Sequence, residues 1–99
     1  MGYAAGVNEY ILLHHDDATA EAGWNEYLAK LRASGQFDGG SSIGAGACFN
    51  KSGPAKPTSS VVGFVRVRAE SLDAARTFLA GNPVYEAGGT VEIRELPKS

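Results

Sequence analysis

The chain has 99 residues, enough for one domain, which we place over residues 1–99 with its core at about 9–96. Its hydrophobic content of 43% and charged content of 20% exclude a disordered protein. A net charge of −2 without any run of Lys or Arg argues against nucleic-acid binding, because phosphate contacts need clustered cations. A single cysteine, Cys48, excludes an internal disulfide and favours a reducing compartment.

No apolar stretch is long enough to span a bilayer, so no membrane partner is expected. Residues 1–7 lack the basic end and the long apolar core of a signal peptide. We therefore expect the protein to be cytoplasmic.

The first predicted element is a strand over about Glu9–His15. Its centre, Tyr10 to Leu13, is continuously apolar and does not alternate, which predicts burial on both faces of a sheet. A domain this small cannot cover both faces of a sheet with its own helices. We therefore expect a second copy of the chain to cover the open face, giving a homodimer.

An amphipathic helix is predicted over about residues 18–34. Apolar residues recur at positions i, i+3, i+4 and i+7, namely Trp24, Tyr27, Leu28 and Leu31. The polar side is expected to carry Asn25, Glu26, Lys30 and Arg32. Either Asp17 or Thr19 is expected to cap the N-terminus, and Gly35 to end the helix.

The glycine-rich segment 36–57 is expected to hold a second strand within Ser42–Phe49 and a turn at Lys51–Pro54. A third strand follows over Ser59–Arg68, with alternating faces. A second helix is expected to begin at the cap Ser71 and to end at Gly81.

A fourth strand over Thr90–Leu96 completes the order strand, helix, strand, strand, helix, strand. This order describes two βαβ halves, the split ferredoxin-like plan. The predicted class is therefore α+β, a βαββαβ subunit with an antiparallel four-stranded sheet. The plan supports many functions, so it predicts a scaffold and not a reaction.

The cluster of residues 14–17 is the densest group of catalytic residue types. His14 and His15 are the candidate catalytic residues, since histidine titrates near neutrality and a nearby carboxylate can orient its ring. The alternative is a polar strand end that leads into a helix cap. Adjacent strand residues point to opposite faces, so the two imidazoles are poorly placed to share one metal, and no metal site is expected.

Four further residues are candidate ligand-binding groups. Trp24 could stack on a ring, although such a residue also serves as core. Asp38 could be a pocket carboxylate or a turn residue beside two glycines. Asn82 and Tyr85 could bind the polar edge of a ligand or contact a second subunit, or belong to an ordinary turn at Pro83.

The glycine-rich segment does not predict a phosphate or dinucleotide site. Phe49 stands where the third glycine of a dinucleotide motif belongs, and Asn50 replaces the glycine that a P-loop requires. No helix follows to supply its amide groups. No cofactor is therefore expected, and Cys48 is expected to pack as a small apolar side chain.

Several short motifs resemble those of the YCII-related, or DGPF, family over about Glu9–Leu96. They are the strand ending in His15-Asp16, Gly63-Phe64, the helix 71–75 (SLDAA) and the ending 88–94 (GGTVEIR). The resemblance implies a ferredoxin-like subunit that pairs sheet to sheet into a dimeric α+β barrel, similar in fold to muconolactone isomerase. It also implies, for some members, enzymatic roles on small cyclic or aromatic compounds.

The chain departs from that family at two functional positions. Members with a His–Asp acid–base pair carry the His early in the first helix and the Asp just before a Pro after the second. Trp24 and Asn82 stand at these positions, and neither side chain can shuttle a proton. The Asp-Gly-Pro-Phe turn of the other branch survives only as residues 52–55 (SGPA).

Two functions follow from the sequence. The first is a small-molecule-binding domain that lacks the acid–base pair of the family. The alternative is an isomerase or lyase that acts on a cyclic or aromatic compound. In that case His14 or His15 is the acid–base group, and Asp38, Asn82 or Tyr85 orients the ligand.

Overall fold

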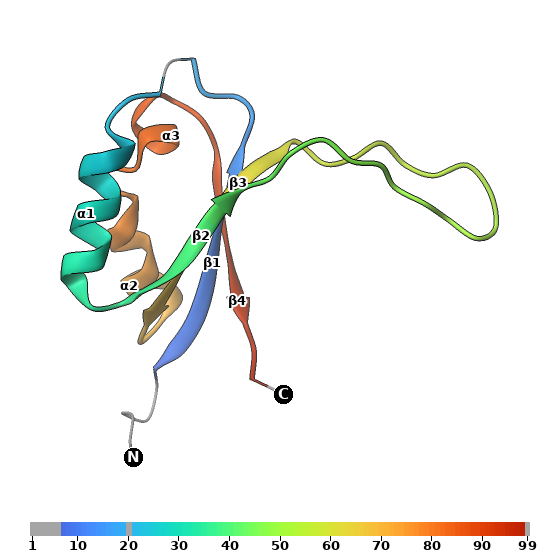
Figure 1. Ribbon diagram of the computed structural model, residues 1–99. Coiled ribbons are helices and arrows are strands. Elements are labelled where there is room, and N and C mark those ends of the chain that lie inside the picture. The colour runs from blue at the N-terminus through green and yellow to red at the C-terminus, as the bar shows by residue number, and fades with distance from the viewer. Residues whose placement is uncertain (1–6, 20, 99) are drawn as a thin grey trace.

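The computed structural model describes residues 7–19 and 21–98 (Figure 1). Most of the segment considered as a signal peptide, residues 1–6, therefore lies outside the described residues. The elements in chain order are β1 (Asn8–His15), α1 (Trp24–Ser34), β2 (Phe37–Ser42), β3 (Val61–Ala69), α2 (Leu72–Arg76), the 3-10 turn η1 (Thr77–Leu79), α3 (Pro83–Glu86) and β4 (Val91–Leu96). Within the described ranges, no helix is both long and apolar enough to cross a membrane.

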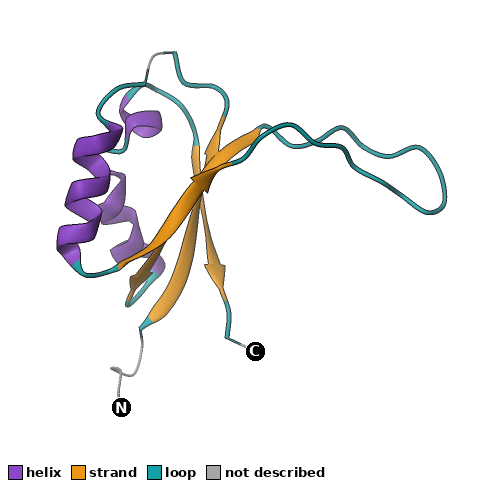
Figure 2. Ribbon diagram, viewed as in Figure 1, coloured by secondary structure: helices purple, strands orange, loops and turns teal. Residues whose placement is uncertain are grey.

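The four strands form one antiparallel sheet in the order β2-β3-β1-β4. The three helices cover one face of this sheet and leave the other face open (Figure 2). The predicted α+β, ferredoxin-like plan is confirmed. The pairing of two such sheets into a barrel stays a prediction.

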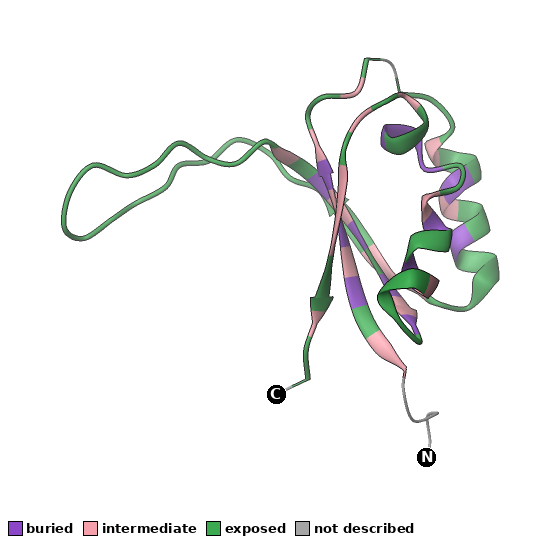
Figure 3. Cartoon of the chain, turned by 180° about the vertical axis from the view of Figure 1, so that it is seen from behind, coloured by how far each residue is buried: buried purple, intermediate pink, exposed green. Residues whose placement is uncertain are grey.

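The core lies between the sheet and the helices (Figure 3). Along β1 the side chains alternate, so that Tyr10, Leu12 and His14 are buried against the helices while the residues between them are partly exposed. Leu31 of α1 and Val67 of β3 are fully buried in the same layer. The apolar run of β1 therefore has one fully buried face and one half-covered face.

The first helix begins later than the sequence predicts. Gly23, in a left-handed conformation with φ 90°, precedes its first residue, Trp24, and Gly35 ends it as expected. Asp17 does not cap the helix, because its carboxylate accepts hydrogen bonds from the backbone and the hydroxyl of Thr90. Thr19 instead donates to the Ala87 carbonyl. The predicted caps therefore bind the segment before β4.

The position of the second strand differs more. β2 covers Phe37–Ser42, whereas the sequence predicted a strand within Ser42–Phe49. Gly40 approaches β3 so closely that a Cβ atom there would clash with the carbonyl oxygen of Phe64. The first glycines of this segment therefore belong to the sheet, where they permit a bulge and a close approach.

Residues 43–60 form a long arm that extends away from the sheet (Figure 1). All of these residues are exposed, and Phe49 in the arm is 92% exposed. Cys48 is also exposed, so the expectation that it packs as an apolar side chain is wrong.

The second helix begins at the predicted cap, since the Ser71 hydroxyl accepts from the Ala74 amide at 3.1 Å. A further helix, α3, was not predicted. Asn82 is its N-cap and accepts from the amides of Val84 and Tyr85, and Pro83 occupies its first position. Asparagine before proline is a helix start as well as a helix break, which explains the difference.

Candidate functional site

A pocket of about 540 Å³ lies between α1 and the sheet, near the end of β1. It is lined by His14, Glu21, Trp24, Leu28, Arg32, Phe37, Gly39, Gly40, Ser41, Ser42, Val62, Gly63, Phe64, Val65 and Val84. The walls are mainly apolar or aromatic, and a few polar groups converge on them. This composition is typical of a small-molecule site.

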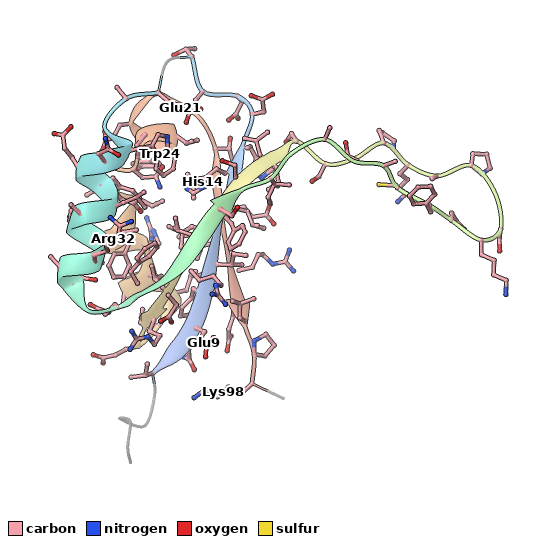
Figure 4. All side chains as sticks on the ribbon, in the orientation of Figure 1. Glu9, His14, Glu21, Trp24, Arg32 and Lys98 are labelled. Atoms are coloured by element: carbon pink, nitrogen blue, oxygen red, sulfur yellow. The ribbon has the colours of Figure 1, made fainter. Side chains whose placement is uncertain are left out.

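The helical wall follows from the spacing of three residues. Trp24, Leu28 and Arg32 follow one another at intervals of four residues in α1, so they lie on one side of the helix, and all three line the pocket. Trp24 and Arg32 are labelled in Figure 4. The indole Nε1 of Trp24 donates to Oε1 of Glu21 at 2.9 Å. The guanidinium of Arg32 lies 6.0 Å from the centre of the Phe37 ring.

The sheet wall contains His14, a residue that is only 2% exposed. The Trp24 ring meets it edge to face, with the ring centres 5.2 Å apart. The Nδ1 side of the imidazole lies beside Gly63, where a Cβ atom would be 3.7 Å from Nδ1. That distance is an ordinary contact, and the tighter one for a side chain at position 63 would be with the Ser41 carbonyl oxygen, at 3.3 Å.

Asn82 determines which ring nitrogen of neutral His14 carries the proton. Its Oδ1 atom accepts from the amides of Val84 and Tyr85, so its Nδ2 group is the part that faces Nε2 of His14, at 3.0 Å. An amide NH₂ group can only donate, and Nε2 must therefore accept. The proton of the neutral ring lies on Nδ1, next to Gly63.

The same amide joins a wider buried network. Asn82 is fully buried and its side chain also hydrogen-bonds to the Tyr27 hydroxyl. Tyr27 in turn donates to the Phe78 carbonyl at 2.7 Å. No buried side-chain nitrogen or oxygen lacks a hydrogen-bond partner in the described part of the chain. The network thus satisfies its members, as buried polar groups require.

Burial lowers the pKa of His14, while the Gly63 backbone and the carboxylate of Glu21 act in the opposite direction. Burial likewise raises the pKa of Tyr27, which the bond from Asn82 offsets in part. Both directions favour the neutral form. The network is therefore uncharged at neutral pH.

The structure separates the predicted site residues into two groups. His14 and Trp24 line the pocket, and Asn82 supports His14 from behind. His15 lies on the opposite face of the sheet, where its ring contacts Ser60 at 2.8 Å and Glu92 at 3.0 Å.

Two other candidates also lie outside this pocket. The Asp38 carboxylate pairs with Arg68, at 2.9 Å, and is not among the lining residues. Tyr85 is half exposed and lines a second, shallower hollow beside α2. No cluster of three or more His, Cys, Asp or Glu residues occurs in 7–19 or 21–98.

Sequence reasoning missed Glu21, Arg32 and Phe37. Arg32 was placed on the polar side of the helix, but the curved strand β2 reaches that side and brings Phe37 beneath its guanidinium. The spacing Trp24, Leu28, Arg32 was the available signal. It could be used only once the position of β2 was known.

The fold and the pocket define a class, a ferredoxin-like α+β subunit with a ligand-sized pocket between its first helix and its sheet. The chain belongs to the YCII-related domain family, whose model matches residues 4–98. This confirms the family that the sequence motifs predicted. No curated protein has a sequence that matches this chain.

A similar solved structure is 5-chloro-2-hydroxyhydroquinone dehydrochlorinase from Burkholderia phenoliruptrix, in complex with 2,5-dihydroxybenzoquinone. It shares 15% sequence identity with a TM-score of 0.56, over 92% of this chain and 95% of that chain. At this identity the likeness supports the fold.

Proposed function

We propose that this domain binds a small cyclic or aromatic compound in the pocket and does not use His14 as an acid–base catalyst. The aromatic rings of Trp24 and Phe37 supply flat apolar walls for such a compound. The similar dehydrochlorinase acts on a substituted ring and was solved with a quinone, which supports the same ligand class.

The hydrogen bond from Asn82 to His14 is the observation that argues against His14 as an acid–base catalyst. A general base needs a lone pair within reach of the proton that it removes. The lone pair of Nε2 already accepts from a buried amide, at 3.0 Å. His14 therefore offers the ligand a ring edge but no free basic nitrogen, because its Nδ1 proton faces the Gly63 backbone.

The second candidate is an isomerase or lyase with His14 as its acid–base group. His14 is favoured over His15 because His14 lines the pocket and His15 does not. In that case Nε2 of His14 would exchange its hydrogen bond from Asn82 for a proton taken from the substrate, and the ring would become imidazolium. The lowered pKa of His14 keeps the ring neutral, which is the form that a general base requires. Turnover would separate this candidate from simple binding.

The test uses 2,5-dihydroxybenzoquinone as the probe, with calorimetry for binding and chromatography for turnover. We expect saturable binding without a product, and a loss of at least about tenfold in affinity for Trp24→Ala. The matched control is Leu72→Ala, which truncates a half-exposed residue of α2 outside the pocket. A product that disappears in His14→Gln would establish the enzyme instead, and equal binding by Trp24→Ala would refute this pocket.

We also infer that the protein forms a homodimer through its open sheet face and acts in the cytoplasm. Ile11, Leu13 and Phe64 give that face an apolar centre that the helices do not cover. The exposed free thiol of Cys48 suits a reducing compartment.

A further inference from the structure

We propose that the ligand of the pocket is a ring compound with an acidic group at one end and a hydroxyl at the other. Arg32 binds the acidic group and Glu21 accepts from the hydroxyl. This inference rests on the proposed function and names the chemistry of the ligand.

Arg32 supplies the anion site. Its guanidinium lies at the pocket rim over the Phe37 ring, and it makes no ion pair with the residues of 7–19 and 21–98. Arg68, Arg76 and Arg94 pair with carboxylates, and Arg66 donates to the backbone carbonyl of Asp38. A guanidinium without a protein partner at the rim of a pocket suits a planar carboxylate, which it can bind through two parallel hydrogen bonds.

Glu21 supplies a negatively charged hydrogen-bond acceptor at the other end of the pocket. One oxygen of its carboxylate accepts from the Trp24 indole, and an ionised carboxylate can accept further hydrogen bonds but cannot donate. A second carboxylate at this end would be repelled. The hydroxyl of a phenol is a donor and therefore fits here. Glu21 also raises the pKa of His14 through its charge, which places its carboxylate at the His14 end of the pocket.

The spacing of the helix separates the two groups. Trp24, which holds Glu21, and Arg32 are eight residues apart in α1, or about 12 Å along its axis. This exceeds the length of one benzene ring. A ring that carries its acid on a short aliphatic chain would fill the pocket better, with Leu28 against the chain. The arrangement of the labelled side chains can be followed in Figure 4.

The experiment compares three probes of nearly equal size by calorimetry. They are para-hydroxyphenylpropionate, its primary amide, and phenylpropionate. Because a hydrogen-bonded ion pair contributes more than a neutral contact, we expect the acid to bind at least about tenfold more tightly than the amide. Removal of the hydroxyl should weaken binding several-fold.

The variant Arg32→Gln should abolish the preference for the acid and leave the affinity for the amide nearly unchanged. Arg76→Gln is the matched control, because Arg76 is exposed and lies on α2. It should keep the preference. Circular dichroism checks that both variants fold, which their exposed positions favour.

The possible failures are distinguishable. Equal affinities of acid and amide, or an acid preference that survives in Arg32→Gln, would overturn the anion site while ring binding stands. Equal affinities with and without the hydroxyl would overturn the role of Glu21. If none of the three probes binds and 2,5-dihydroxybenzoquinone does not bind either, the proposed function fails together with this inference.

Discussion

The Nδ2 atom of Asn82 lies 3.0 Å from Nε2 of His14, although the two residues are 68 positions apart in the chain. An amide at this position holds the imidazole neutral, whereas a carboxylate would hold it charged. Trp24 covers the ring edge to face. The chain thus retains a polar pair beneath its pocket but not one that titrates as an acid and a base.

Asn82→Asp should raise the pKa of His14 above its ordinary value of about 6.5. The new carboxylate would accept from Nε2 and from the helix amides, which favours the imidazolium. NMR titration of the ring protons measures the change. Asn25→Asp, on the exposed side of α1, adds the same charge away from the ring and should leave the pKa of His14 unchanged. A pKa of His14 in Asn82→Asp that is no higher than in the wild type would contradict the assignment.

Stability should fall as the pH drops below about 6.5, because the pKa of His14 is lower in the folded state than in the unfolded chain. Just below pH 6.5, His14 binds a proton in the unfolded chain but not in the folded state. The contribution of one such group is at most about 1.4 kcal/mol per pH unit, and it is absent above the unfolded pKa. Urea unfolding of the wild type and of His14→Gln at several pH values tests this. Parallel pH profiles for the two proteins would exclude His14 as the cause.

Tyr27→Phe should lower the free energy of unfolding by about 1–3 kcal/mol, because it leaves the buried Phe78 carbonyl without its donor. The control Tyr85→Phe removes the same hydroxyl from a half-exposed ring and should change stability by no more than about 0.5 kcal/mol. Chemical denaturation provides both values. Similar losses in the two variants would mean that the buried network does not contribute as argued.

Leu13→Asp should convert a dimer into a monomer, because Leu13 lies at the centre of the open sheet face between Phe64 and Glu92. Light scattering at micromolar concentration measures the mass. Leu72→Asp places the same charge on a half-exposed residue of α2 and should leave the dimer intact. A wild-type protein that is monomeric under these conditions would rule out the dimer.

Much of the fold could be predicted from local signals in the sequence. Tyr27 and Leu31 recur with helical spacing and are buried in α1, and Gly35 and Ser71 stand at the helix ends where their conformations are favoured. The alternation along β3 likewise corresponds to its two faces. These features depend on neighbours within a few residues, so a sequence pattern can record them.

The position of β2 and the composition of the pocket were decided by tertiary structure. Gly40 belongs to a strand because its backbone meets β3 too closely for a side chain, a requirement that no local pattern expresses. Arg32 lines the rim of a pocket because β2 brings Phe37 beneath it. Asn82 carries a local signal for a helix start, but its role as the partner of His14 arises only when β1 and α3 meet. Side-chain chemistry and helical spacing are local properties, whereas contacts between residues distant in the chain exist only in the folded protein.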